Sequence, residues 1–404
     1  MTAFLEEGLY DMATKHTDDA YDFAQIVERR GTDSVKWSRY ENDVIPLWVA
    51  DMDFPAPEPV LNVLRERVEH GVFGYGQEPG DLRAVVQDRM QRRYGWSVAP
   101  DDLLYLPGVV VGFNLVARAV GKPGDGVLIQ PPAYPPFFLV GKNNDRVVQE
   151  APLVRDGDRY EIDFDAFEAA ITPATRVFLL CNPHNPVGRV YTRAELERLA
   201  EICLRHDLII CSDEIHQDFV FDGYRHVPIA SLAPEVAART VTLISPSKTY
   251  NIAGFHFAIA VASNPERREL LQKTAAGLVP GRPGVLDFLA GLAAYQHGDS
   301  WLDGMIHYLQ SNKEFLTAYV RRELPGVSMS TVEGTYLAWL DCGEAGIEGS
   351  PYDFFLKNAR VAPQDGAHFG VGSEGFVRLN FGCPRSTLEE ALGRMKQALL
   401  LLRQ

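Results

Sequence analysis

The stretch TLISPSKTYNIAG, residues 242–254, places one lysine, Lys248, between an apolar run and a polar turn that ends in glycine. The run before it has the length and the β-branched content of a buried strand, so Lys248 comes shortly after a strand end. A lysine in this position is compatible with three roles: a solvated surface charge, a ligand for phosphate, or a nucleophile. Which role applies depends on what the rest of the chain brings near it.

Between about residues 100 and 262, short apolar runs alternate with amphipathic segments. The segment TRAELERLAEICLRHD, residues 192–207, predicts a helix, because Thr192 is a suitable N-cap, Glu195 completes a capping box and the apolar residues have helical spacing. Strands that alternate with helices predict a mostly parallel sheet covered on both faces. Four runs have the composition of buried strands: DGVLIQPP (125–132), RVFLLCNP (176–183), LIICSDE (208–214) and TVTLISPS (240–247).

Polar residues repeatedly follow these predicted strands. In a parallel sheet, ligands bind beyond the carboxyl ends of the strands. Taken singly, each of these residues has an ordinary structural explanation as a cap, a turn residue or a solvated charge. Their shared position predicts that they gather around one ligand. They are Tyr134, Asn185, Asp213, Ser245, Ser247 and Lys248.

After about residue 285 the pattern changes. A long helical region at 287–324 is followed by two apolar segments, TYLAWLD (335–341) and GFVRLNFG (375–382), and by an amphipathic helix at 386–404. This order predicts a smaller α/β domain that long helices join to the larger one.

Composition limits the classes of partner. The net charge is −15 and the acidic residues are spread along the chain, which argues against nucleic acid or an anionic membrane as a partner. Apolar runs such as GVVVGFNLVARAV (108–120) are interrupted by charge well before the roughly 20 residues that a membrane span needs. The N-terminus lacks the basic and apolar pattern of a secretory signal. We therefore expect a cytoplasmic protein that binds neither nucleic acid nor membrane.

The five cysteines lack CxxC spacing, and several lie in strand-like runs. Buried reduced thiols are expected, with no disulfide and no metal site. The cysteines are Cys181, Cys203, Cys211, Cys342 and Cys383.

Three spaced motifs give the chain a family resemblance. CNPHNPVG (181–188) is followed by SDEIH (212–216), whose Asp213 lies 28 residues after Asn185, and by SPSKTYNIAG (245–254), whose lysine lies 35 residues after Asp213. In this order they resemble the pyridoxal-phosphate (PLP) enzymes of fold type I, in the aminotransferase class I/II superfamily. The resemblance runs from about residue 21 to the C-terminus, and the first twenty residues lie outside it.

Four further motifs resemble one group within that superfamily, the PatB/MalY-like carbon–sulfur lyases, which include cystathionine β-lyases. The resemblance implies an α/β fold with a mostly parallel seven-stranded sheet in the large domain and a smaller C-terminal α/β domain. The implied parts are an N-terminal extension and arm (1–50) that packs with the small domain, a large PLP-binding domain (51–285) and a small domain (286–404). The motifs are PLWVADMDFPAPEPV (46–60), GTYLAWLD (334–341), DGAHFG (365–370) and VRLNFGCPRSTLEEAL (377–392).

The resemblance also assigns the catalytic residues. Lys248 would form the Schiff base with the cofactor aldehyde and later act as a base beside the substrate Cα. Asp213 would keep the pyridine nitrogen protonated, which lets the ring accept electrons. Tyr134 would stack on the cofactor ring. Arg378 would bind the substrate carboxylate as a bidentate donor.

The remaining cofactor contacts follow from the same resemblance. Asn185 would bind the phenolic oxygen of the cofactor and help to orient the substrate carboxylate. His216 occupies a position where aminotransferases usually have tyrosine, so it is either a donor to that oxygen or a packed histidine. Val109 and Val110 would offer backbone amides to the phosphate, and Ser245 and Ser247 would offer hydroxyls.

Two positions concern the subunit interface and the reaction type. Tyr75 matches a tyrosine that reaches the phosphate of the neighbouring subunit, which implies a homodimer. His256 stands where aminotransferases usually have a phosphate-binding arginine, eight residues after Lys248. PatB-like lyases also tend to lack that arginine, so His256 favours the lyase branch.

The leading hypothesis is a PLP-dependent β-lyase that splits an S-substituted L-cysteine, such as cystathionine, into a thiol, pyruvate and ammonia. An aminotransferase shares the first steps and is the main alternative. A PLP-binding regulatory protein is the third, although the chain shows no helix-turn-helix segment and no basic face.

Overall fold

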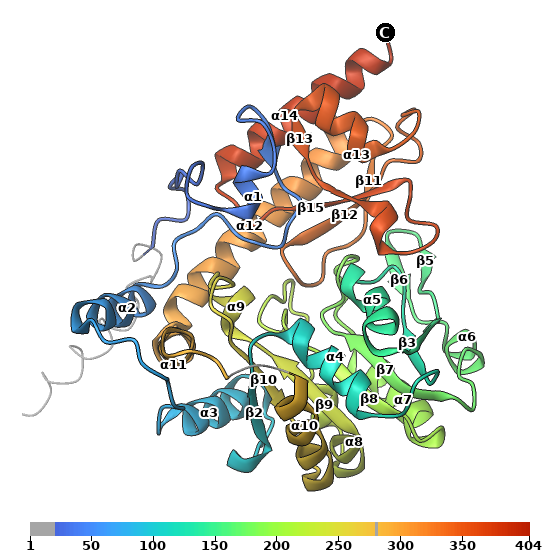
Figure 1. Ribbon diagram of the computed structural model, residues 1–404. Coiled ribbons are helices and arrows are strands. Elements are labelled where there is room, and N and C mark those ends of the chain that lie inside the picture. Colours follow the sequence, from blue (N-terminus) through green and yellow to red (C-terminus); the bar gives the residue numbers. More distant parts are fainter. Residues whose placement is uncertain (1–20, 279–281) are drawn as a thin grey trace, which may run out of the picture.

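The computed structural model describes residues 21–278 and 282–404 (Figure 1). Its centre is a seven-stranded sheet with the strand order β2-β10-β9-β8-β7-β3-β4. Within this sheet β10 runs antiparallel to both of its neighbours, and the other pairs are parallel. The predicted mostly parallel sheet is confirmed. Its strands are β2 (Leu103–Leu106), β3 (Gly126–Ile129), β4 (Val147–Glu150), β7 (Thr175–Cys181), β8 (Ile209–Asp213), β9 (Thr240–Ile244) and β10 (Ala258–Val261).

Both faces of this sheet are buried, which explains the continuous apolar runs in the sequence. In β7, Val177 and Leu179 pack into the core on one face, whereas Phe178 and Leu180 pack into the core on the other. Successive side chains of a strand point to opposite faces, so a strand covered on both sides needs apolar residues at every position.

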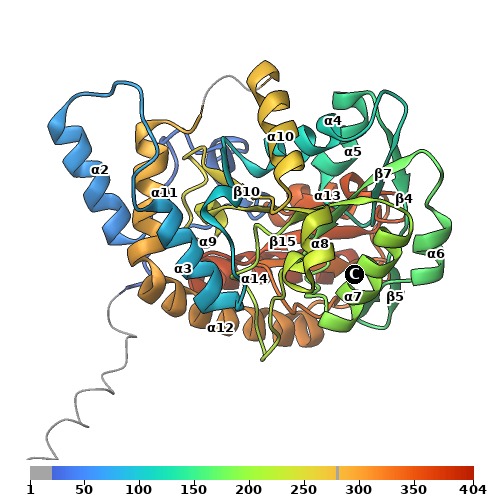
Figure 2. The same cartoon turned by 90° about the horizontal axis from the view of Figure 1, so that it is seen from below.

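Helices form the two covering layers (Figure 2). The predicted capping box of α7 is confirmed: Thr192 Oγ1 accepts a hydrogen bond from the Glu195 amide at 3.2 Å, and the Glu195 carboxylate accepts one from the Thr192 amide at 2.7 Å. On one face lie α4 (Val109–Ala119), α5 (Pro135–Asn144) and α10 (Pro265–Leu278), and on the other lie α6 (Phe164–Ala169), α7 (Arg193–Arg205) and α8 (Pro234–Arg239).

A second, antiparallel sheet with the order β11-β12-β15-β14 shares a core with the long helices. The predicted helical region divides at Gly298, where a Cβ atom would lie 2.4 Å from the Ala294 carbonyl oxygen and 2.4 Å from the Tyr250 ring. The elements are β11 (Ser328–Met329), β12 (Leu337–Asp341), β14 (Gln364–Asp365), β15 (Phe376–Asn380), α11 (Val285–His297), α12 (Asp299–Glu323), α13 (Pro351–Phe354) and α14 (Arg385–Leu402).

The N-terminal part of the described chain lies against this second sheet region. Strand β1 (Ile45–Pro46) pairs in parallel with β13 (Val361–Ala362). The chain then continues through residues 48–55, here called the 48–55 segment, towards α2. The predicted extension over the first twenty residues lies outside the described residues. The remaining α-helices and strands are α1 (Val35–Ser38), α2 (Glu58–His70), α3 (Leu82–Tyr94), α9 (Pro246–Thr249) and the hairpin of β5 (Val154–Asp156) and β6 (Arg159–Glu161).

A buried charge cluster anchors the 48–55 segment. The Asp53 carboxylate accepts hydrogen bonds from Lys36 Nζ at 2.6 Å, from Arg29 Nη1 at 2.7 Å and from Trp37 Nε1 at 2.8 Å. Asp53 and Lys36 are almost wholly buried. Because removing Asp53 would leave Lys36 buried without its counter-charge, the cluster holds this segment firmly in place.

Two further findings concern the whole described chain. All five cysteines are buried and free. None of the helices in residues 21–278 and 282–404 combines the length and apolar character needed to cross a bilayer.

Candidate active site

Strands β8 and β9 end side by side and carry the two central residues. Asp213 is the last residue of β8 and lies opposite Leu243 of β9. The chain after β9 turns into the short helix α9, which contains Lys248 and has Ser245 as its N-cap. Because parallel strands end at the same edge of the sheet, Asp213 and Lys248 reach the same site.

Lys248 is partly buried, and its amine is held by the protein. Its Nζ donates a hydrogen bond of 2.6 Å to the carbonyl oxygen of Ala50, in the 48–55 segment. Burial lowers the pKa of Lys248; the charge of Arg378 acts in the same direction, whereas Asp51 and Asp213 oppose it. A lowered pKa increases the neutral fraction of the amine, which is the form that acts as nucleophile or base. These surroundings exclude the role of a solvated surface charge.

The carboxylate of Asp213 is buried with few partners. Its Oδ1 accepts a hydrogen bond of 3.1 Å from the backbone amide of Ile215. Burial raises the pKa of Asp213 to about 7; the charge of Glu214 adds to this effect, and that of Lys248 opposes it. Such a carboxylate fits a ligand that brings a positive charge to it, as a protonated pyridine nitrogen does.

Arg378 of β15 and Asn185, which follows β7, lie together between the two sheets. Arg378 Nη1 donates to Asn185 Oδ1 at 2.9 Å, and Nη2 donates to the Trp48 carbonyl oxygen at 2.7 Å. Arg378 Nε is buried and has no partner among the described residues. Burial lowers the pKa of Arg378 to about 10, so the guanidinium remains charged at neutral pH. A charged donor without a partner fits a ligand carboxylate.

His216 and Tyr134 border the same site as neutral groups. Burial lowers the pKa of His216 to about 3, and the charges of Lys248 and Arg378 contribute. The imidazole is therefore neutral at pH 7, and its buried Nδ1 has no partner within the described chain. Burial and the nearby charge of Asp213 raise the pKa of Tyr134, the N-cap residue of α5. A neutral imidazole can donate one hydrogen bond and accept another, as the predicted contact with a phenolic oxygen requires.

Three further residues lie at the site without having been predicted there from the sequence: Tyr336, Ala50 and Asp51. The Tyr336 hydroxyl donates to the Ala50 carbonyl oxygen at 3.1 Å, across 286 positions of sequence. Asp51 is close enough to affect the pKa values of Lys248 and Tyr336. Their motifs, WVADMD and GTYLAWLD, supported the family resemblance. No local pattern, however, indicated that the tyrosine and the lysine share one carbonyl.

The predicted phosphate contacts lie at two helix starts. Val109 and Val110 are the first residues of α4, directly after Gly108, and amides at a helix start lack acceptors within the helix. The Ser245 hydroxyl lies 2.7 Å from the Phe257 carbonyl oxygen and 2.8 Å from the Ser247 hydroxyl. The Ser245 hydroxyl oxygen also accepts a hydrogen bond of 3.0 Å from the Ser247 backbone amide, and this bond caps α9. The phosphate roles of Ser245 and Ser247 stay predictions.

Tyr75 and His256 are both exposed. No hydrogen bond or ion pair joins either side chain to Lys248 or Asp213 in the described part of the chain. The backbone amide of His256 donates to Asp287 Oδ1 at 3.0 Å. Full exposure of the Tyr75 ring is compatible with its predicted contribution to a second subunit.

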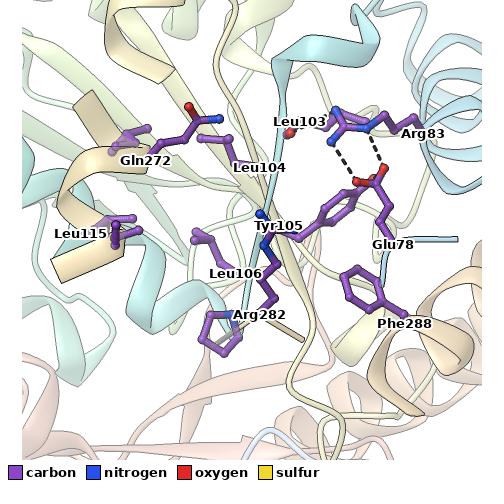
Figure 3. Close-up of a pocket in the computed structure, with 14 residues that line it drawn as sticks. Glu78, Arg83, Leu103, Leu104, Tyr105, Leu106, Leu115, Gln272, Arg282 and Phe288 are labelled. Carbon is purple, nitrogen blue, oxygen red and sulfur yellow. Dashed lines mark hydrogen bonds and ion pairs between the residues drawn. The ribbon is translucent and has the colours of Figure 1, made fainter. Parts of the chain in front are cut away.

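A cavity of about 580 Å³ beside the edge strand β2 is a different site (Figure 3). Its walls are mainly apolar and contain the ion pair between Arg83 Nε and Glu78 Oε1 at 2.6 Å. None of the predicted site residues lines this cavity.

The gathered donors fit pyridoxal phosphate. Lys248 would offer an amine to the aldehyde, Asp213 would offer a carboxylate to the ring nitrogen, and His216 would offer a ring nitrogen without a partner to the phenolic oxygen. The start of α4 would offer amides to the phosphate. Among these groups, the buried Nδ1 of His216 has no partner in the described chain, and the buried Asp213 carboxylate has no counter-charge bonded to it.

Comparison with known proteins agrees with this fit. The family model for aminotransferase class I and II matches residues 42–395. The cystathionine β-lyase PatB of Bacillus subtilis (strain 168) is 39% identical over 386 residues, which cover 93% of this chain and 99% of PatB. The crystal structure of OvoB is 43% identical, with a TM-score of 0.90, and covers 94% of this chain and 99% of its own. Cystalysin from Treponema denticola, which contains pyridoxal 5'-phosphate, is 34% identical, with a TM-score of 0.91, over 95% of this chain and 99% of its own. The predicted fold type is confirmed, and the chain belongs to the aminotransferase class I and II family.

Proposed function

We propose that this chain is a PLP-dependent carbon–sulfur β-lyase. With one water molecule, it would convert an S-substituted L-cysteine, such as cystathionine, into a thiol, pyruvate and ammonia. Relatives named cystathionine β-lyase or C–S lyase, among them PatB and the PLP-bound enzyme from Staphylococcus hominis, support this assignment. The PLP chemistry itself is supported by the convergence of Lys248 and Asp213, at one edge of the large sheet, with the Asn185–Arg378 pair. The named relatives favour the lyase over the aminotransferase.

The cofactor, when bound, supplies an aldehyde for the amine and a ring that accepts the electrons of the Cα–H bond. Lys248 holds the cofactor, takes the Cα proton on Nζ and keeps the resulting ammonium near the Ala50 carbonyl. Asp213 balances the positive charge of the ring nitrogen. Arg378, steadied by Asn185, binds the substrate carboxylate, which fixes Cα beside the lysine.

The other contacts are proposed from the family resemblance. Tyr134 covers the ring, and Asn185 and His216 donate to the phenolic oxygen. Val109 and Val110 amides, with the Ser245 and Ser247 hydroxyls, hold the phosphate, and His256 lies at the position where aminotransferases place an arginine. We also propose the division into an arm (1–50), a large domain (51–285) and a small domain (286–404). The cytoplasmic location stays a prediction.

A homodimer is part of this proposal. Tyr75 of one subunit would reach the phosphate site of the other, and its full exposure supports this arrangement. The test mixes two inactive variants, Tyr75→Ala and Lys248→Ala. Mixed dimers contain one site of two in which both residues are intact, so about half of the wild-type activity should return per mixed dimer, or about a quarter over a random one-to-one mixture. No recovery from verified mixed dimers would contradict a shared site.

The reaction is tested with purified protein, cystathionine or S-methylcysteine and no keto acid. Thiol and pyruvate should accumulate over many turnovers, and Lys248→Ala should produce neither. A single turnover that ends in pyridoxamine phosphate would instead identify an aminotransferase. A Lys248→Ala protein that kept a physiological effect would favour a regulatory role.

A further inference from the structure

Two donors share one backbone acceptor in the site. Lys248 Nζ and the Tyr336 hydroxyl both donate to the carbonyl oxygen of Ala50, at 2.6 and 3.1 Å. The Tyr336 side chain is almost fully buried. Its ring packs edge-on against Phe219 at 4.9 Å and against His216 at 5.7 Å, measured between ring centres. Packing on two sides therefore fixes where the hydroxyl can lie.

The shared carbonyl belongs to a firmly held backbone. Asn380 Nδ2 donates to the carbonyl oxygens of Val49 at 2.7 Å and of Asp51 at 2.9 Å, on either side of Ala50. Asn251 Oδ1 accepts from the amide of Met52 at 3.1 Å. The peptide at Ala50 thus has little freedom to turn towards one donor and away from the other.

The two donors weaken each other's interaction with this oxygen. A carbonyl oxygen has two lone pairs and can accept both hydrogen bonds. The hydroxyl hydrogen brings a partial positive charge to the oxygen that also holds the ammonium, so it disfavours the charged form of Lys248. The neutral amine depends less on this carbonyl and loses less when it leaves.

We propose that Tyr336 is a positioning residue for Lys248. The Tyr336 hydroxyl occupies part of the Ala50 carbonyl and so favours release of the neutral Lys248 amine from that carbonyl. The inference rests on the proposed function, in which Lys248 is the lysine that holds the cofactor. Tyr336 acts through the carbonyl and not on the substrate.

Other charged and titratable groups face this pair from several elements, and replacing the hydroxyl alone leaves them in place. Among them, the buried imidazole of His216 and the phenol of Tyr134 are neutral at pH 7. The groups are Asp51 of the 48–55 segment, Asp213 and His216 at and after the end of β8, Arg378 of β15 and Tyr134 at the start of α5.

The test uses the full-length chain after removal of the cofactor. Competitive acetylation between pH 6.5 and 10, followed by mass spectrometry, gives the pH midpoint for labelling of Lys248. In Tyr336→Phe the midpoint should rise by about half a pH unit, and uptake of PLP at pH 7 should slow about threefold, because the neutral fraction of the amine falls in proportion. Tyr295→Phe is the matched control: its buried hydroxyl has no partner among the described residues, so no shift is expected.

A second variant tests the direction in which the hydroxyl of residue 336 shifts the labelling midpoint of Lys248. A 3-fluorotyrosine at position 336 keeps the ring and is a stronger donor, and burial, which raises the pKa of Tyr336, keeps the phenol protonated. In this variant the pH midpoint for labelling of Lys248 should fall. A midpoint in Tyr336→Phe that is unchanged or lower would overturn the inference, as would two variants that shift in the same direction. If Tyr336→Phe does not fold, the fluorinated variant decides alone.

This test separates the inference from the proposed function. If the shifts appear but wild-type protein produces no thiol or pyruvate, the lyase assignment fails and the link between Tyr336 and Lys248 stands. If wild-type protein is an active lyase and neither variant moves the midpoint, the inference fails and the lyase assignment stands.

Discussion

Replacing Asp213 by asparagine should stabilise the cofactor-free protein at alkaline pH. Asp213 is an acid whose pKa burial raises from 3.8 to about 7 in the folded state. Between these two values the folded protein binds more protons than the unfolded chain does, so this group lowers stability as pH rises. Below pH 4 the carboxyl is protonated in both states and costs nothing. An asparagine side chain does not titrate, so the Asp213→Asn variant should lack this loss.

The expected size follows from the two pKa values. A shift of about three units corresponds to roughly 4 kcal/mol of lost stability once the folded carboxyl is fully ionised. Between pH 5 and pH 8, wild-type protein should lose about 3 kcal/mol through this group. The difference in unfolding free energy between Asp213→Asn and wild type should therefore grow by that amount over the same range.

Urea denaturation of the cofactor-free proteins at pH 5, 6, 7 and 8 measures this difference. Asp218→Asn is the control of opposite sign. Burial alone would raise the pKa of Asp218, but Arg89 and Arg93 lower it to about 2, so this variant should be less stable at pH 8. In the loaded enzyme, Asp213→Asn should lose lyase activity by about a hundredfold or more, since the ring nitrogen loses its counter-charge. Stability curves of wild type and Asp213→Asn that stay parallel from pH 5 to pH 8 would refute the reasoning.

Three further substitutions test the site and its support. Lys248→Ala should abolish both pyruvate formation and the borohydride-stable cofactor adduct detected by mass spectrometry; an adduct on another lysine would contradict the assignment. Arg378→Lys keeps the charge but loses the planar fork, so kcat/KM for S-methylcysteine should fall about 10- to 100-fold, and an unchanged value would argue against carboxylate binding. Asp53→Ala leaves Lys36 buried without its partner and should cost about 3–5 kcal/mol in urea denaturation. Glu28→Ala, at an exposed ion pair, should cost less than about 1 kcal/mol, and equal losses would show that the Asp53 cluster is not special.

The centre of the site could be predicted from the sequence because each of its residues follows a recognisable strand, and a parallel sheet brings the ends of its strands together. Asp213 and Lys248 each follow an apolar run, and a parallel sheet brings such strand ends to one edge whatever the loops do. Arg378 could not be placed in this way, since it lies on the second sheet. Its role came from the family resemblance, and the structure adds its hydrogen bonds to Asn185 and Trp48.

The contacts of the 48–55 segment could not be predicted from local patterns. Ala50 contributes only a backbone carbonyl, which any residue has, so no residue type marks its position. The hydroxyl of Tyr336 reaches this carbonyl only because Phe219 and His216 hold the ring. Such contacts depend on packing between segments that are far apart in the sequence, and propensity and periodicity carry no information about them.

Burial shifts the pKa values of four central groups, and a bound ligand can reverse these shifts. It raises the pKa of Asp213 and lowers the pKa values of Lys248, His216 and Arg378, so every shift disfavours the charged form. The cofactor-free protein therefore holds the charges of Asp213 and Arg378 at a cost in stability, and a ligand that brings a cation to Asp213 and a carboxylate to Arg378 removes part of that cost. The same burial keeps Lys248 available as a neutral amine. Cofactor binding should consequently stabilise the protein more at pH 8, where Asp213 is ionised, than at pH 5. The rise in melting temperature that PLP causes should therefore increase with pH in wild type. In Asp213→Asn it should increase much less.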